Sequence, residues 1–435
     1  MSPQGARRRF SLPRGVLPAL LAGLTALAGW LALRAAQTQD SSGSRLWGTV
    51  YMVVGINSDE QLDSGLRQLA AEAMNRFSKD FRELHPGVDI QLMTFPEDQL
   101  VRQLGFRQQG GLGPDLLLVN SRTAVELQRL NLVRSVTFPA ELLQQIEPDM
   151  LARLRLGDGT LAGLPVLQLP QLACFNRERL PTGSPDSLDG LLQLSSRGLR
   201  VGLSAIPQHL FWTAGGMGAT EAVLAALGDE PLRPDQKQSL ERWLAWLQNA
   251  SLQQSFTFYD KQDELALLLA NGNLDWISCR SSTITLLRQK LGAKLGVASL
   301  PGGRWGAATP INRERVLVFG LNSSPAQRQV ALEMAKFSVN PVVQRNLTLS
   351  TLVMLPVNRF APAPVASSAT LAAMARSVEE SDGANPLIQV LIGDRKAEQA
   401  LSSVLNRVLY GDLTPRQGVG ILPESLRKAR HGSPP

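Results

Sequence analysis

The chain has 435 residues, of which 44% are hydrophobic and 19% are charged. This length favours two lobes or domains, and the composition is typical of a globular protein. The formal charge is +7, but many basic residues gather at the two ends, and no basic stripe with interleaved aromatics is present, which disfavours nucleic-acid binding. The histidines at 85, 209 and 431 lie far apart. We therefore expect no metal site, no cofactor and no catalytic residues.

The N-terminus predicts export. Basic residues through Arg14 precede residues 16–33, a run of eighteen residues without a charge. Such a run fits either a signal peptide or a short membrane span, and the positive-inside rule sends the following chain across the membrane. We expect residues 1–36 to be a signal peptide or an uncleaved inner-membrane anchor and residues 37–44 to be a linker. The protein is therefore expected to be exported to the periplasm.

The first part of the chain alternates strands and helices. The elements predicted from apolar periodicity are a strand at 46–56, a helix at 65–84, a strand at 88–95, a further helix and a fully apolar strand at 116–119. A strand without polar positions is typical of a sheet that is covered on both faces. The order therefore predicts three parallel strands in one sheet.

Polar side chains follow two of these strands. Asn57 and Ser58 come after the first strand, and Asn120, Ser121 and Arg122 come after the third. Ligands of open α/β sheets bind at the carboxyl ends of the strands. These five residues are therefore candidate ligand contacts.

The second part of the chain begins with a predicted turn at Asp158 and Gly159. The apolar run 166–175 is interrupted by Pro170, which argues against one central strand and indicates a crossing between lobes. The elements expected after it are helices at 190–195, 218–227, 234–252 and 262–271 and strands at 199–204, 274–279, 295–300 and 316–321. Cys174 and Cys279 could form a disulfide in an exported protein or remain as two buried thiols.

Several motifs in this order resemble the extracellular solute-binding proteins of family 1, which include the maltose-binding protein of ABC importers. The matching segments are Gly113-Pro114-Asp115 before the apolar strand, Asp158-Gly159 with Gly163 and Pro165, Phe175-Asn176-Arg177-Glu178, Asn271-Gly272, Leu300-Pro301-Gly302, Pro356-Val357 and Gly411 to Pro415. The resemblance covers roughly residues 46–425.

This resemblance implies an α/β, type II periplasmic-binding-protein fold with two lobes, a hinge and a cleft between the lobes. Lobe one is expected at 45–168 with 307–349, lobe two at 169–306 with 350–426, and a flexible basic tail at 427–435. In the cleft, Phe175 stands where the family often has Tyr, and Trp212 follows a strand that faces the cleft. Trp305, flanked by glycines on a crossing segment, is the strongest aromatic candidate. Ser281 starts a helix and is either a ligand contact or an N-cap.

The function that the resemblance implies is capture of a small polar organic solute, a sugar or glycoside, and its delivery to the permease of an ABC importer. Two alternatives stay open. One is a membrane-tethered sensor or adaptor without a transport role. The other is an exported α/β hydrolase, which would need a Ser or Cys within reach of His209.

Overall fold

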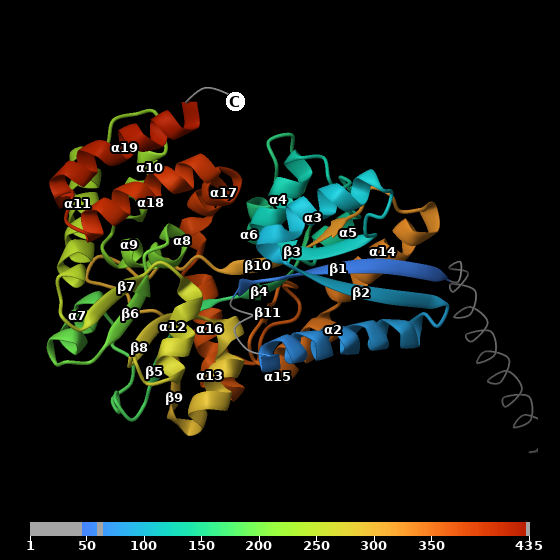
Figure 1. Cartoon of the computed structure of the whole chain (residues 1–435), viewed down its shortest axis with the longest axis horizontal. Helices are drawn as coiled ribbons and strands as arrows, with labels where there is room; N and C mark the ends of the chain where they lie inside the picture. Colours follow the sequence, from blue (N-terminus) through green and yellow to red (C-terminus); the bar gives the residue numbers. More distant parts are fainter. Residues whose placement is uncertain (1–45, 59–63, 432–435) are drawn as a thin grey trace, which may run out of the picture. The chain divides into compact units, whose positions relative to one another are not determined.

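The computed structural model describes residues 46–58 and 64–431 and contains two β-sheets that are flanked by helices (Figure 1). The first sheet has the strand order β11-β4-β10-β3-β1-β2. Its strands are β1 (Gly48–Ile56), β2 (Val88–Pro96), β3 (Leu116–Asn120), β4 (Leu164–Leu169), β10 (Arg313–Phe319) and β11 (Leu355–Pro356). Its helices are α2 (Ser64–Leu84), α3 (Glu97–Gln109), α4 (Ser121–Arg129), α5 (Ala140–Leu143), α6 (Pro148–Arg153), α14 (Pro325–Ser338) and α15 (Pro341–Thr351).

The second sheet has the order β7-β6-β8-β5-β9. Its strands are β5 (Gln171–Asn176), β6 (Val201–Ser204), β7 (Phe256–Tyr259), β8 (Trp276–Arg280) and β9 (Leu295–Ala298). The other helices are α7 (Leu188–Ser196), α8 (Pro207–Leu210), α9 (Trp212–Gly216), α10 (Thr220–Ala226), α11 (Pro234–Ser251), α12 (Gln262–Ala270), η2 (Ser281–Thr283), α13 (Ile284–Leu291), η3 (Gly292–Lys294), η4 (Val365–Ser367), α16 (Ala369–Glu379), η5 (Asp382–Ala384), α17 (Asn385–Gly393), α18 (Arg395–Leu409) and α19 (Pro415–His431). The expected α/β fold with two lobes is confirmed.

The βαβαβ prediction for the first lobe is confirmed. Strand β1 pairs in parallel with both β2 and β3. The side chains of 116–119 in β3 are all buried, since helices cover both faces of this sheet: α3 and α4 lie on one side and α2 and α15 on the other (Figure 1).

The crossing between the sheets occurs at Pro170. Strand β4 ends at Leu169 in the first sheet, and β5 begins at Gln171 in the second. Proline has no N–H to donate to a ladder, so the sheet pairing breaks at this residue. The predicted turn before β4 is also present: Gly159 has a φ of +84°, and the Asp158 side chain accepts a hydrogen bond from the Thr160 N–H.

Hydrogen bonds between buried polar side chains tie the crossings together. Asn312, which precedes β10, accepts a bond from the Gln171 N–H (2.9 Å) and donates to the Ser377 carbonyl (3.1 Å). Ser377 in turn donates to the Gln171 carbonyl (2.7 Å). Gln171 and Asn312 lie on two passages of the chain between the sheets, and Ser377 lies in α16, so this cluster joins both passages to that helix.

A buried ion pair lies near the same crossings. Arg153 of α6 donates to Glu314 of β10 (2.7 Å), to the Asn385 side chain (2.6 Å) and to Ser381 (3.1 Å). Both charged side chains are almost completely buried. Burial raises the pKa of Glu314, and the charge of Arg153 opposes this rise. Removal of one partner from such a pair leaves a buried charge uncompensated. The bonds from Arg153 to Ser381 and Asn385 hold the segment 381–385 against the first lobe.

Three details differ from the sequence predictions. Strand β11 pairs with β4, so the first sheet extends beyond the expected boundary at residue 349. Strand β7 lies between the helices expected at 234–252 and 262–271, where the sequence analysis predicted no strand. Helix α19 continues to His431, so residues 427–431 of the expected flexible tail are helical, and 432–435 lie outside the described residues.

The predicted export segment at 16–33 and the linker at 37–44 also lie outside the described residues. Within 46–58 and 64–431, none of the helices has the length and apolar character that a membrane span requires.

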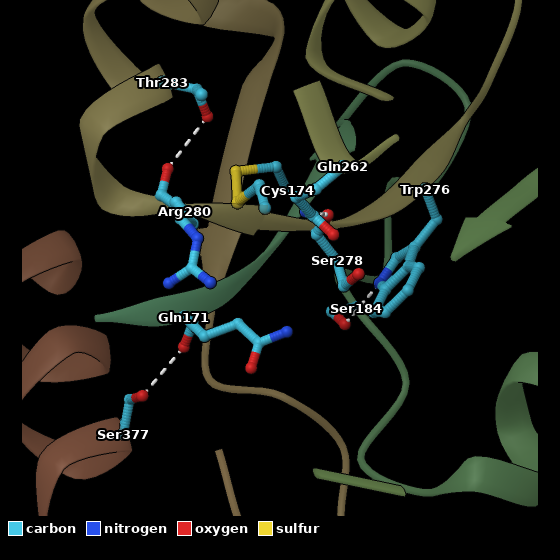
Figure 2. Close-up of a disulfide and its surroundings, with 10 residues drawn as sticks. Gln171, Cys174, Ser184, Gln262, Trp276, Ser278, Arg280, Thr283 and Ser377 are labelled. Carbon is cyan, nitrogen blue, oxygen red and sulfur yellow. Dashed lines mark hydrogen bonds between the residues drawn. A yellow bond between two sulfur atoms is a disulfide. The ribbon is translucent and has the colours of Figure 1, made fainter. Parts of the chain in front are cut away.

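The two cysteines form a disulfide between neighbouring strands of the second sheet. Cys174 of β5 and Cys279 of β8 have Cα atoms 5.8 Å apart and are separated by 105 residues in sequence. Gln171 and Arg280 are paired in register on these two strands (Figure 2). The disulfide therefore fixes β5, which starts at the crossing, to β8, which ends in Arg280.

We expect the double variant Cys174→Ser/Cys279→Ser to lose about 2 to 4 kcal/mol of unfolding free energy, because the bond closes a long loop in the unfolded chain. Urea denaturation monitored by circular dichroism measures this loss. Reduced wild-type protein should show the same decrease, and an unchanged urea midpoint in the variant would contradict a stabilising bond.

Candidate functional site

A cavity of about 740 Å³ lies between elements of the two lobes. One wall comes from the segments that follow β1 and β3 and from the start of α3. The opposite wall comes from α8, the end of β8 and the α17–α18 region. The chain that enters β10 at Arg313 also lines the cavity. The residues that line it are Ile56, Asn57, Ser58, Pro96, Glu97, Asp98, Gln99, Val101, Arg102, Asn120, Ser121, Arg122, Thr123, Glu126, Gln208, His209, Arg280, Ile311, Asn312, Arg313, Ile388 and Arg395.

The structure brings together all five polar residues that were singled out at the ends of the first and third strands. Asn57, Ser58, Asn120, Ser121 and Arg122 line the cavity. The Asn120 amide donates a hydrogen bond to the Asn57 side-chain oxygen. The parallel pairing of β1 with β3 places both strand ends at one edge of the sheet, which explains this proximity.

A buried arginine below this wall holds the two strand ends. Arg315 of β10 donates to the carbonyls of Gly55 (2.6 Å) and Leu118 (3.1 Å) and to the Asn120 side chain (3.3 Å). Glu97 at the start of α3 lies 3.5 Å from the Arg315 guanidinium and accepts a bond from the Asn120 N–H (2.7 Å). The position of Asn120 therefore depends on both members of this ion pair.

Gly55 leaves the space that the Glu97 carboxylate occupies. A Cβ atom at position 55 would lie 1.9 Å from Glu97 Oε2, whereas one at Gly105 in α3 would meet open space. The absence of a side chain in β1 thus allows Glu97 to reach Arg315 and Asn120.

His209 of α8 lies in the opposite wall, where it keeps part of its surface open to the cavity. Burial, together with the positive charges of Arg280, Arg313 and Arg122, holds the pKa of His209 well below 6.5. The imidazole is therefore neutral at physiological pH. Its Nδ1 lies 3.4 Å from the Ser204 hydroxyl, which also accepts a bond from the Ile206 N–H.

This serine is the group that a hydrolase would require near His209. Ser204 is completely buried in β6 and does not line the cavity. A serine nucleophile must reach the substrate carbonyl, so the contact orients the imidazole and provides no accessible nucleophile.

Contacts between α4 and the α17–α18 region close one side of the cavity. Arg122 forms an ion pair with Glu398, and Arg395 lies 3.7 Å from Glu126. Arg129 donates to the Gly393 carbonyl. These contacts join the two lobes in the arrangement that the structure shows.

The aromatic candidates are not in the cavity. Phe175 is buried, with its ring over Gly296 of the neighbouring strand β9. Trp212 is fully buried, and its ring centroid lies 6.3 Å from that of Trp276. Trp305 is 48% exposed, but it lies outside the lining, where the Arg242 guanidinium stacks on it at 4.1 Å. Phe175 and Trp212 are therefore part of the packing of the second lobe. The Trp305 ring contacts Arg242 of α11.

Ser281 is also absent from the lining. It is fully buried, and its N–H donates to the Pro170 carbonyl (2.9 Å). The preceding residue, Arg280, faces the cavity instead. The cavity lining at the end of β8 therefore includes Arg280 and not Ser281.

The sequence analysis did not single out Glu97, Arg280, Arg313 or Arg315, and it named His209 only in connection with a hydrolase. The sequence does contain a signal for Arg313 and Arg315. The segment Arg313-Glu314-Arg315 places three charged residues at the start of an apolar strand. Charged residues at that position point to a buried polar site. Across residues 46–58 and 64–431, His, Cys, Asp and Glu form no group that could hold a metal ion.

Solved structures of sugar- and solute-binding receptors share this architecture. The GacH receptor of Streptomyces glaucescens matches with a TM-score of 0.68 and 14% identity over 88% of this chain and 98% of its own. The chain has the two-lobed fold of the periplasmic solute-binding proteins.

Two further structures support this assignment of the fold. A solute-binding protein of Thermotoga lettingae bound to α-D-tagatose has a TM-score of 0.64 and 16% identity over 88% of this chain and 99% of its own. UgpB of Mycobacterium tuberculosis in complex with glycerophosphocholine has a TM-score of 0.66 and 15% identity over 88% and 98%. A scan against protein-family models gives no match, and neither does a search of curated proteins.

We expect Gly55→Ala to destabilise the protein by about 1 to 3 kcal/mol, because the new methyl group displaces the Glu97 carboxylate from Arg315 and Asn120. Gly105→Ala is the matched control and should stabilise helix α3 by up to about 1 kcal/mol. Chemical denaturation of both variants measures the difference. Equal effects would show that Gly55 has no special role.

Stability should also fall with acid through His209. The unfolded histidine binds a proton below about pH 6.5, whereas the folded one does not, so unfolding is favoured by up to about 1.4 kcal/mol for each pH unit below this value. Urea denaturation at pH 7.5 and 5.5 should show a smaller decrease for His209→Gln than for the wild type. If both proteins lose the same free energy, the neutral buried imidazole is not responsible.

Proposed function

We propose that this protein is the solute-binding component of an ABC importer and that it binds a small polar organic solute, a sugar or glycoside, between its lobes. The observation that carries this proposal is the cavity of about 740 Å³ with polar lining from both lobes. Its volume suits a small molecule, and hydrogen-bond donors and acceptors predominate on its walls. The GacH and tagatose-bound neighbours are receptors of such solutes.

The proposed site consists of Asn57, Ser58, Asn120, Ser121, Arg122 and Arg313 on the first lobe, with His209 and Arg280 opposite them. Amide and hydroxyl groups can donate to and accept from solute hydroxyls. Bending at the crossings would separate the two walls, and a bound solute would favour the closed form because it contacts both.

The proposal includes export to the periplasm, with residues 1–36 as a signal peptide or an inner-membrane anchor, and docking of the loaded form on permease subunits. It requires no cofactor and no chemical change of the solute. Recovery of a bound solute unchanged after incubation with the purified protein fits this role, whereas conversion to a product would not.

A thermal-shift screen tests the function. Mono-, di- and trisaccharides, polyols and their acidic and phosphorylated derivatives are added to the purified full-length chain. A solute that binds only the folded state at 100 times its Kd should add about 2.7 kcal/mol of stability, which raises Tm. The same solute should reduce the radius of gyration measured by small-angle X-ray scattering. The complete absence of a shift would contradict a receptor for this class of solute.

A further inference from the structure

The second-lobe wall of the cavity contains a histidine whose ring is held from behind. His209 lines the cavity and is half-buried, whereas Ser204 at the end of β6 is completely buried and does not line it. The Ser204 hydroxyl lies 3.4 Å from His209 Nδ1. Because Cε1 separates the two ring nitrogens, this contact leaves Nε2 on the other edge of the ring, away from Ser204.

The backbone of His209 is also fixed. Its N–H donates to the Ile206 carbonyl (2.9 Å), and its carbonyl accepts a bond from the Gln171 side-chain amide (2.6 Å). Gln171 begins β5 at the crossing, where its own N–H donates to Asn312. The imidazole therefore has a defined position in the wall before any solute binds.

The hydrogen bonds of Ser204 decide which ring nitrogen carries the hydrogen. The hydroxyl accepts a bond from the Ile206 N–H (3.2 Å), and His209 Nδ1 is its only other partner in the described part of the chain. A serine hydroxyl has one hydrogen to donate. If Nδ1 were protonated, the Ser204 hydrogen would be buried without an acceptor, which costs free energy. The hydroxyl therefore donates to an unprotonated Nδ1.

An unprotonated Nδ1 places the hydrogen of the ring on Nε2. Burial is the main cause of the low pKa of His209, so the ring is neutral and has one donor and one acceptor nitrogen. Among residues 46–58 and 64–431, no hydrogen-bond partner faces Nε2, and this atom is not one of their buried polar atoms without a partner. The Nε2–H group therefore remains open to the cavity.

We propose that Ser204 holds His209 as the Nε2–H tautomer and that this Nε2–H donates a hydrogen bond to an oxygen of the solute. The inference rests on the proposed function and deepens it, because it gives His209 a role in specificity and Ser204 a positioning role. The oxygen belongs to a hydroxyl, ether, carbonyl or carboxylate group, all of which accept hydrogen bonds. A protonated amine has no lone pair and is disfavoured at this point of the wall.

Nitrogen-15 NMR of the imidazole rings tests the tautomer without a solute. The full-length chain has three histidines, and the variants His209→Gln and His85→Gln assign their signals. At neutral pH we expect the long-range couplings of His209 to show a protonated Nε2 and a bare Nδ1. A protonated Nδ1, an equal mixture of tautomers or a charged ring in the wild type overturns the inference.

Ser204→Ala tests the positioning role with the same spectrum. This change removes the hydroxyl that donates to Nδ1, so we expect His209 to become a mixture of the two tautomers. An unchanged tautomer in the folded variant overturns the role of Ser204. If Ser204→Ala does not fold, the wild-type spectrum still decides the tautomer.

Two variants of different length test the bond to the solute. His209→Asn places an amide near the position of Nδ1, beside Ser204, and leaves no donor at the position of Nε2. His209→Gln is one methylene longer, so its amide reaches toward the position of Nε2 and keeps a donor there. His85→Gln is the control, because His85 does not line the cavity.

Glucose, maltose and glucitol are the probes, measured by calorimetry on the full-length chain, and the same comparison is made with any solute that the wider screen identifies. We expect His209→Asn to weaken binding about 5- to 30-fold, His209→Gln to weaken it less and His85→Gln to leave it unchanged. Unchanged affinity of His209→Asn for a solute that the wild type binds overturns the inference and leaves the receptor function intact. No binding of any solute by the wild type overturns both the receptor function and the bond to the solute.

Discussion

The cavity depends on one buried guanidinium. Arg315 is almost fully buried in β10, and a buried charge is tolerated only where it is paired and hydrogen-bonded. Glu97 supplies the opposite charge, while the carbonyls of Gly55 and Leu118 accept two further bonds. These partners belong to α3, β1 and β3, so a single side chain holds the ends of two strands and the start of a helix in one place. Asn120, which contacts both members of the pair, takes its position from this arrangement.

Much of the fold follows from local patterns, whereas the site follows from contacts between distant segments. The apolar run 116–119 and the amphipathic helix before it were sufficient to predict the parallel sheet, and Pro170 was sufficient to locate a crossing. Asn57 and Asn120 were found because strand ends meet at one edge of a parallel sheet. Arg315 was not, because one of its partners lies 197 residues away in sequence. The surroundings of His209 likewise include Arg122, Arg280 and Arg313, which only the folded chain brings near it.

The aromatic residues also show that residue type alone does not locate a binding site. Trp212 and Phe175 have the residue types that a sugar site would use, but the interior of the second lobe also needs large apolar side chains. Sequence alone does not distinguish these two uses. Positions 280 and 281 differ in a similar way, because β8 ends at Arg280 and the helix η2 begins at Ser281. Arg280 lines the cavity, whereas Ser281 is fully buried.

The crossings and the lining of the cavity share the same backbone. Arg313 directly follows Asn312, whose side chain holds the Gln171 N–H, and Arg280 directly follows Cys279 of the disulfide. Arg122 and Arg313 belong to elements of the first lobe, whereas Arg280 ends a strand of the second sheet. The Arg122–Glu398 pair joins α4 to α18 beside the cavity. Separation of the lobes would break this pair, so a bound solute that contacts both walls would add to an interaction that already favours the closed form.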